Sequence, residues 1–321
     1  VLAPWPNHEP ELDTEWIDDD SMPLPLRTRL GSLRVLTQWC CVQKKADLVP
    51  PVLKLLWILL GTGEVHRDQH IPLGVRSRLR LFAAQCILKL ATCDAYASLI
   101  LPRMGRLSYA LQDECFQVRM HLLHDLLLYL MRDELPTEFH AAIFLVAFDP
   151  EDEPRVQVAS YTRRLQVLPP IVRHERLERI IVRFLHLLAH HPDLNAESPQ
   201  TLCSFARYLE FYLACVACET NIGVLARFSA CVRTYIDLSL SEPSVENSRP
   251  LYAMAELAQF LIQRLADNHG WTIYPVDEEA PCPKDILRST GTIARSVLDG
   301  EVWELLQQQP RRHRDKKTKV A

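Results

Sequence analysis

Two histidine pairs have a spacing that could build a metal site on a helix. His186 and His190 stand four residues apart, which places two imidazole rings on one helix face. A zinc protease would also need a glutamate between them as general base, but Leu187 cannot accept a proton. His121 and His124 lack a nearby cluster of carboxylates. We therefore expect hydrogen-bonded histidines in the interior or in a groove, and we assign no metal ligand.

Cys215 and Cys218 form a C-x-x-C pair, a spacing found in zinc sites and in redox-active thiols. A zinc site would need a second pair, and a redox site would need a helix-start thiol in a βαβ unit. The sequence has neither, and apolar periodicity places the pair inside a helix. The chain has 10 cysteines and no signal-peptide pattern, so we expect reduced thiols. Those in apolar helical runs are expected as small buried side chains (Cys40, Cys86, Cys215 and Cys231).

Glycine-rich loops that hold phosphates or nucleophiles do not occur in the sequence. There is no G-x-x-x-x-G-K-[ST], no G-x-S-x-G and no Gly-rich dinucleotide turn. Only 9 of 321 residues are glycine, under half of the usual share of about 7%. The sequence therefore predicts a non-catalytic protein with no cofactor and no small-molecule substrate. A helical enzyme is the least supported alternative.

The apolar residues that would position these side chains recur with helical spacing. In 198–218 they are separated by 3, 4, 3, 1 and 3 residues, and 250–266 repeats that series. Prolines stand where such segments should end. The one candidate strand is Trp271–Tyr274, and no run of about 18 apolar residues could span a membrane. We expect an all-α chain with helices at 24–43, 48–60, 72–92, 112–131, 138–148, 152–166, 174–190, 198–218, 222–238 and 250–266.

Internal similarity predicts stacked helix pairs. The stretch 79–91 aligns with 118–130 at an offset of 39 residues, close to the period of roughly 40 to 47 in HEAT and armadillo repeats. Residues 113–119 resemble the start of the second helix of a HEAT repeat: Asp113 can accept backbone N–H groups there, and Arg119 follows six residues later. Arg80 and Arg155 stand near matching points, so these residues either bond neighbouring repeats in a ladder or line a groove. The fold class is a HEAT-repeat α-solenoid of antiparallel helix pairs.

Charge and proline content divide the chain into four parts. Residues 1–22 hold seven acids and no Lys or Arg, and they are expected as an acidic linker. Residues 23–270 carry the HEAT-like repeats. Residues 271–309 are expected as an extended capping segment with one short helix in 298–309. Residues 310–321 hold six bases against one acid and are expected as a basic disordered tail.

Six strings in the chain, in this order, resemble strings of one family. They are Asp13–Asp20, Arg78–Ala91, Asp113–Arg119, Ala142–Pro150, His186–Asp193, and the set of Leu251-Tyr252, Glu256–Gln259 and Gly270-Trp271. The family is the "precocious dissociation of sisters" family of cohesin regulators, and the resemblance is collinear over roughly residues 13–290.

The resemblance implies a large nuclear HEAT-repeat protein that binds the kleisin subunit of cohesin on chromatin. It would work there with releasing, protecting and acetylating factors to control sister chromatid cohesion and cohesin release. Only the later part of such a protein is expected here, because the family's earlier elements, including its releasing-factor contact, have no counterpart in these residues. No binding residue is carried over. The alternative is another nuclear HEAT-repeat adaptor, such as a transport receptor or a different chromatin-complex subunit.

The basic tail has two functional interpretations besides a solvated end. Its lysines and arginines contact DNA phosphates rather than nucleobases, or they form a nuclear-import signal (Arg311, Arg312, Arg314, Lys316, Lys317 and Lys319).

Deleting residues 310–321 tests the DNA interpretation. We expect weaker DNA binding at low salt, because fewer phosphates are neutralised. A filter-binding or anisotropy titration of the full and shortened chains at two salt concentrations measures this. Equal affinity of the two chains for DNA would reject DNA contact through the tail.

Overall fold

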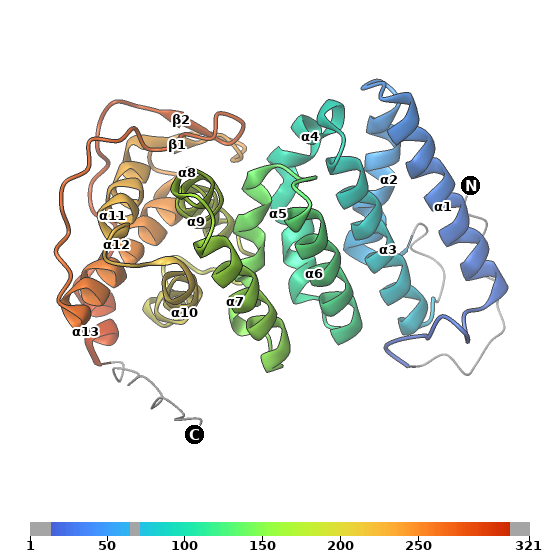
Figure 1. Ribbon diagram of the computed structural model, residues 1–321, viewed down its shortest axis with the longest axis horizontal. Helices are drawn as coiled ribbons and strands as arrows, with labels where there is room; N and C mark the ends of the chain where they lie inside the picture. Colours follow the sequence, from blue (N-terminus) through green and yellow to red (C-terminus); the bar gives the residue numbers. More distant parts are fainter. Residues whose placement is uncertain (1–13, 65–70, 309–321) are drawn as a thin grey trace.

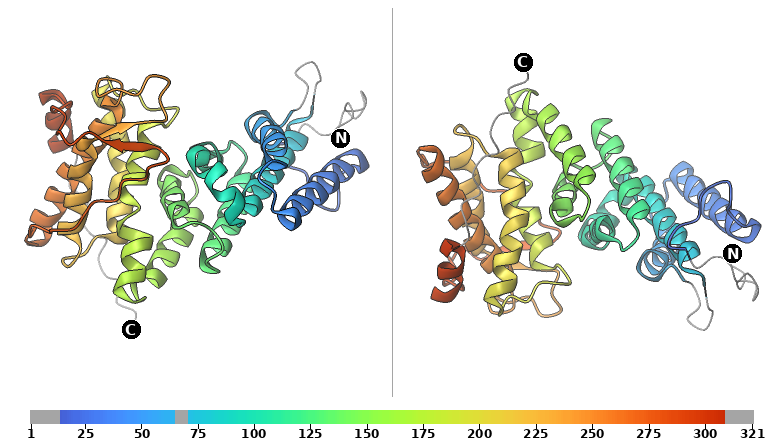
Figure 2. Two further views of the ribbon diagram at one scale, coloured as in Figure 1. Left: turned by 90° about the horizontal axis from the view of Figure 1, so that it is seen from above. Right: turned by 90° about the horizontal axis from the view of Figure 1, so that it is seen from below.

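In the computed structural model, residues 14–64 and 71–308 are described, and helices stack along the long axis of the molecule (Figure 1). The first part contains α1 (Leu24–Gln43), α2 (Val49–Thr62), α3 (Leu73–Ala91), α4 (Asp94–Ile100), η1 (Leu101–Arg103), α5 (Met104–Ser108), η2 (Tyr109–Gln112), α6 (Phe116–Met131) and η3 (Thr137–Phe148). The second part contains α7 (Asp152–Gln166), α8 (Pro170–Arg173), η4 (His174–Glu178), α9 (Ile181–Ala189), α10 (Pro199–Val216), α11 (Ile222–Cys231), η5 (Val232–Thr234), β1 (Tyr235–Asp237), α12 (Arg249–His269), β2 (Leu287–Ser289) and α13 (Gly300–Gln308). The views from above and below show the same progression from α1 to α13 (Figure 2). The predicted all-α helical-repeat solenoid is confirmed.

Prolines begin several of the helices, as their missing N–H allows. α10 starts at Pro199, and the Ser198 side chain caps it by accepting the Thr201 N–H at 3.3 Å. α12 has Pro250 in its first turn and is followed by Gly270 as its C-cap, whose φ of 68° suits a residue without Cβ. Local chemistry therefore determines where these helices start and stop.

Two predictions of secondary structure near the C-terminal end are wrong. The expected helix 222–238 ends at Cys231, and β1 follows it. β1 pairs antiparallel with β2, with Ile236 opposite Arg288. The expected strand Trp271–Tyr274 has no strand geometry. A strand needs a hydrogen-bonding partner, and the fold supplies one to β1 but not to residues 271–274.

Residues 14–22 of the expected acidic linker pack on α3. Ile17 is buried, and a Cβ added to Gly74 would lie 2.8 Å from both Ile17 Cγ1 and Thr14 O. The Arg78 guanidinium holds this segment by donating its Nε–H to Ile17 O at 2.6 Å. The remainder of that linker, residues 1–13, and the basic tail 310–321 lie outside the described residues.

No helix in the described ranges has the length and apolar character needed to cross a membrane.

The centre of the solenoid contains a long 3₁₀ segment instead of an α-helix. Every side chain of η3 from Phe139 to Ala147 is buried, so the segment has no polar face. His140 lies within it, donates its Nδ1–H to Thr137 O at 2.8 Å and accepts the Tyr161 hydroxyl at 2.9 Å. Burial lowers the pKa of His140 to about 4, against the opposing effect of the Thr137 hydrogen bond.

The neutral His140 makes the fold sensitive to acid. Its pKa lies below the value of about 6.5 in the unfolded chain, so its contribution is complete above pH 6.5 and is lost as the pH falls toward 4. We expect about 2 kcal/mol of the unfolding free energy lost between pH 7.5 and pH 5 to come from this residue. Urea unfolding at both pH values should show that His140→Gln loses less unfolding free energy between pH 7.5 and pH 5 than the native chain does, by that amount. The matched control is His124→Gln at an exposed site, and an equal effect of both variants would contradict the assignment.

Candidate interaction surface

An arginine of one repeat forms an ion pair with an aspartate that lies just before a helix of the next repeat. Arg80 on α3 donates its Nε–H to Asp113 Oδ2 at 2.6 Å and an Nη2–H to Asp113 Oδ1 at 2.8 Å. Asp113 Oδ1 also accepts the Cys115 N–H at 2.9 Å, just before α6 begins. One carboxylate thus fixes the turn that leads into α6 and bonds the preceding repeat.

A second rung of the same design lies one repeat further on. Arg119 on α6 donates its Nε–H to Asp149 Oδ2 at 2.8 Å and an Nη2–H to Glu151 Oε2 at 2.6 Å. Asp149 is buried, and its Oδ1 accepts the Glu151 N–H at 3.1 Å. Burial acts to lower the pKa of Arg119, but the hydrogen bond and charge of Asp149 and the charge of Glu151 raise it overall. We call the pairs Arg80–Asp113 and Arg119–Asp149 the ladder.

Arg155 does not extend the ladder to another repeat. Its guanidinium bonds the Asp149 carbonyl oxygen and the Asp152 carboxylate, which both lie at the start of its own helix, α7. Arg119 makes a matching bond to its own helix start, Asp113 O, at 2.8 Å. Arg155 therefore keeps only the half of the pattern that fixes a helix start.

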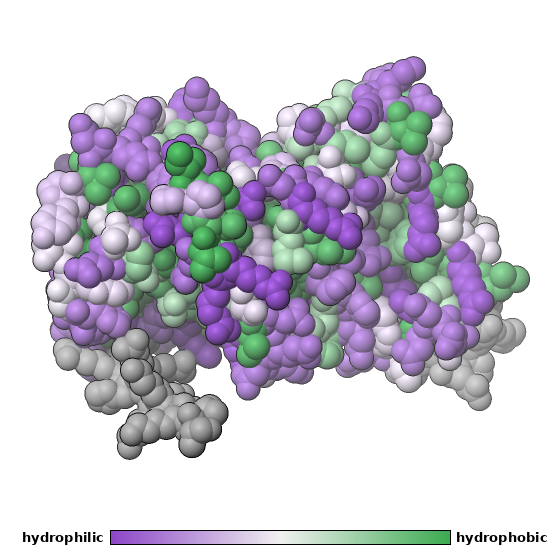
Figure 3. All heavy atoms as spheres, in the orientation of Figure 1, coloured by the Kyte–Doolittle hydropathy of each residue, from purple (hydrophilic) through white to green (hydrophobic). Residues whose placement is uncertain are grey.

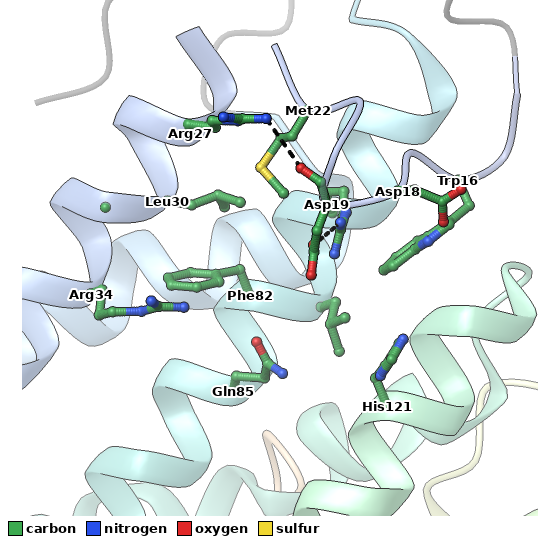
Figure 4. A pocket seen from close by; sticks show the side chains of 13 residues that line it. Trp16, Asp18, Asp19, Met22, Arg27, Leu30, Arg34, Phe82, Gln85 and His121 are labelled. Carbon is green, nitrogen blue, oxygen red and sulfur yellow. Dashed lines mark hydrogen bonds and ion pairs between the residues drawn. The ribbon is translucent and has the colours of Figure 1, made fainter. Parts of the chain in front are cut away.

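A groove of about 570 Å³ lies between residues 16–22, α1, α3 and α6 (Figure 4). We call it the first groove. Trp16 stacks on His121 with ring centroids 5.6 Å apart, and the Arg78 guanidinium lies 4.1 Å from the centroid of the Trp16 ring. Across the groove, the exposed Arg34 reaches over Phe82 at 5.3 Å. Aromatic rings and guanidinium groups thus face one recess.

A second groove of about 650 Å³ lies beside the ladder, and Asp113, Arg119 and Asp149 are among its lining residues. The Arg207 guanidinium lies 4.3 Å from the centroid of the Phe148 ring at this groove. The ladder and groove interpretations of Asp113 and Arg119 are thus not exclusive, because the same side chains do both.

The face shown in Figure 3 is mainly hydrophilic, with apolar side chains gathered over α7 and α8. Val167 and Ile171, which flank the start of α8, are 84% and 80% exposed. Such an isolated apolar patch is ordinary for a protein surface.

His186 and His190 meet an aspartate that the sequence did not associate with them. Asp237, at the end of β1, lies with Oδ1 3.3 Å from His186 Nε2 and with Oδ2 2.6 Å from His190 Nε2. Burial lowers the pKa of His186 despite its bond to Asp237. Burial acts to raise the pKa of Asp237, but the hydrogen bonds and charges of the two histidines outweigh it and hold that pKa below its usual range. We call these three side chains the His–His–Asp cluster.

The C-x-x-C pair straddles the end of a helix, so its predicted place inside one is wrong. α10 ends at Val216, and Cys218 lies in the following turn with Sγ 3.2 Å from Thr220 Oγ1. Burial raises the pKa of Cys215 to about 11, which leaves an unreactive thiol. All 10 cysteines are free thiols; Cys40, Cys86 and Cys215 are buried as expected, whereas Cys231 is half-buried.

Comparison with known proteins gives the family. Residues 3–288 match the model of the family described as "Sister chromatid cohesion protein PDS5 protein". The chain belongs to the PDS5 family. The resemblance identified from the six strings is thereby confirmed.

Relatives with this name occur in fungi and vertebrates. The chain is 27% identical over 287 residues to sister chromatid cohesion protein pds5 of Schizosaccharomyces pombe, which covers 88% of this chain and 23% of the relative. It is 22% identical over 333 residues to PDS5 of Saccharomyces cerevisiae, covering 91% of this chain and 26% of the relative. It is 30% identical over 202 residues to PDS5 homolog A of Danio rerio, covering 58% of this chain and 15% of the relative. The chain thus spans about a quarter of the length of these fungal PDS5 proteins.

The ladder should dominate the stability of the middle of this PDS5-family solenoid. Arg119→Ala leaves the buried Asp149 carboxylate without its partner, which we expect to cost about 3–5 kcal/mol of unfolding free energy. Arg155→Ala removes an ion pair with the exposed Asp152 and should cost about 1 kcal/mol or less. Urea denaturation measures both losses of unfolding free energy, provided that the native chain and the two variants have the same m-value. Equal losses in the two variants would show that Asp149 does not depend on Arg119.

Proposed function

We propose that this part of a PDS5-family protein is a non-catalytic scaffold that controls sister chromatid cohesion by binding the kleisin subunit of cohesin. The first groove would hold the kleisin segment. The proposal places the protein on chromatin in the nucleus and gives it the cohesin-associated releasing, protecting or acetylating factors as further partners. Family membership supports the cohesion role, because the relatives are named sister chromatid cohesion proteins.

The residues of the first groove are the reason for choosing it as the binding site. Tryptophan and arginine are the residues that most often dominate binding energy at protein interfaces. Trp16 offers a ring that is already held between Arg78 and His121, so little side-chain freedom is lost when a partner binds. Arg34 is exposed and supplies a positive charge at the rim. A partner segment with an apolar side chain and nearby carboxylates fits this arrangement.

The charges of the first groove support a linear acidic partner. The Asp19 carboxylate is paired with Arg78, and Arg27 donates to the backbone oxygens of Asp19 and Asp20, at 3.3 and 3.1 Å. Within residues 14–64 and 71–308 Arg27 has no ion pair, and it lines the groove together with Arg34 and the carboxylate of Asp18. An acidic linear segment complements these charges better than a neutral surface would.

Pull-down and titration with the cohesin kleisin test the proposal, with a transport GTPase as the competing partner. We expect kleisin to bind, and Trp16→Ala and Arg34→Glu to weaken it about tenfold or more, as for interface hot spots. The matched controls are the exposed aromatic Tyr274→Ala and the exposed arginine Arg249→Glu. Thermal unfolding of each variant checks that the solenoid is intact.

Three outcomes would count against the proposal. Binding of the transport GTPase in place of kleisin would favour the alternative adaptor role. Equal weakening by groove and control variants would remove the first groove as the site. Failure of a longer, repeat-complete chain to bind kleisin would reject the function itself.

A further inference from the structure

The His–His–Asp cluster joins two distant parts of the C-terminal half. His186 lies on α9, His190 is the residue directly after the end of α9, and Asp237 ends β1. The three side chains present one donor atom each, and these atoms all lie within 4.8 Å of one another. We propose that His186, His190 and Asp237 bind a zinc ion that fastens β1 to α9.

The donor set and its spacing suit zinc. Two imidazole nitrogens and one carboxylate oxygen are common protein ligands of Zn²⁺, with bonds of about 2.0–2.2 Å. Around a tetrahedral ion such atoms lie about 3.3–3.5 Å apart. His186 Nε2 and Asp237 Oδ1 already have this separation, at 3.3 Å, whereas His190 Nε2 lies 2.6 Å from the other carboxylate oxygen, Oδ2. An ion held by both imidazoles would therefore face both oxygens of Asp237, and the His190 side chain, which is 31% exposed, would move outward to admit it.

The surrounding groups hold the carboxylate in place. Asp237 Oδ1 accepts the Ser239 N–H at 2.8 Å, and the Asp237 N–H donates to Ser248 Oγ at 3.1 Å. Pairing of Asp237 with Leu287 keeps β1 against β2. Metal ligands in proteins are commonly oriented by such outer hydrogen bonds. Ser239 Oγ lies 3.1 Å from His186 Nε2 and is a further oxygen beside the cluster.

The charges around the cluster permit a cation. Asp237 is a buried carboxylate, with a side chain only 2% exposed. The nearby cation on α9 is Arg183, whose guanidinium is neutralised by two bonds to Asp285 at 2.8 and 2.7 Å. The His190 side chain is 31% exposed, so the cluster borders solvent on that side. The competing explanation is a metal-free network in which both histidines donate a proton to Asp237.

Zinc binding by the full 321-residue chain, first treated with chelator, tests the assignment. Equilibrium dialysis against Zn²⁺ alone measures the stoichiometry, and thermal unfolding with and without Zn²⁺ measures the linkage between binding and folding. We expect a Zn²⁺-dependent rise in melting temperature for the native chain. His190→Gln and Asp237→Asn should lose it and bind Zn²⁺ at least about tenfold more weakly.

Matched variants separate this site from other zinc ligands. His124→Gln changes an exposed histidine on α6 and should behave as the native chain. The 10 free thiols are present in every variant, so zinc bound by cysteine would not differ between them. No melting-temperature rise in the native chain, or the same rise in His190→Gln, would overturn the proposal. Because Asp237→Asn removes a buried charge, His190→Gln remains decisive if the aspartate variant does not fold.

Discussion

A buried aspartate at the start of a helix holds neighbouring repeats together in the middle of this solenoid. Asp149 accepts a backbone N–H of its own helix start, pairs with Arg119 of the preceding repeat, and offers its carbonyl oxygen to Arg155. The Asp149 carboxylate has little access to water. Moving Arg119 away from it would leave a buried charge unpaired, which costs free energy. Asp113 repeats the design with Arg80, so the relative positions of three successive helical layers follow from two carboxylates.

The same pairs determine the surface that partners can meet. Asp113, Arg119 and Asp149 line the second groove, so the bonds that fix the repeats also shape its wall. In the first groove Arg78 has the same role of fixing the wall. It bonds Ile17 O and the Asp19 carboxylate, and its guanidinium lies against the Trp16 ring. The walls of both grooves are therefore fixed by bonds within the chain itself, which reduces the entropy that a binding event would have to spend on ordering them.

Much of the architecture was predictable because the signals are local. Apolar periodicity and proline positions gave the helices, and the offset of 39 residues between two copies placed Arg80 and Arg119 at matching points. The 3₁₀ geometry of η3 was harder to predict, because the segment is buried along almost its whole length and has no polar face to give a period. The sequence also places Arg155 near a matching point, and only the structure shows that it serves its own helix start.

The sequence by itself determined that the chain is a succession of helices, because helix formation depends on residues within a few positions of one another. Only the tertiary structure decided which distant side chains meet. Asp237 lies 51 and 47 residues from the two histidines that it joins, β1 finds its partner strand after a long connection, and Trp16 reaches His121 on α6. Such contacts depend on the path of the whole chain through space, which no local pattern encodes.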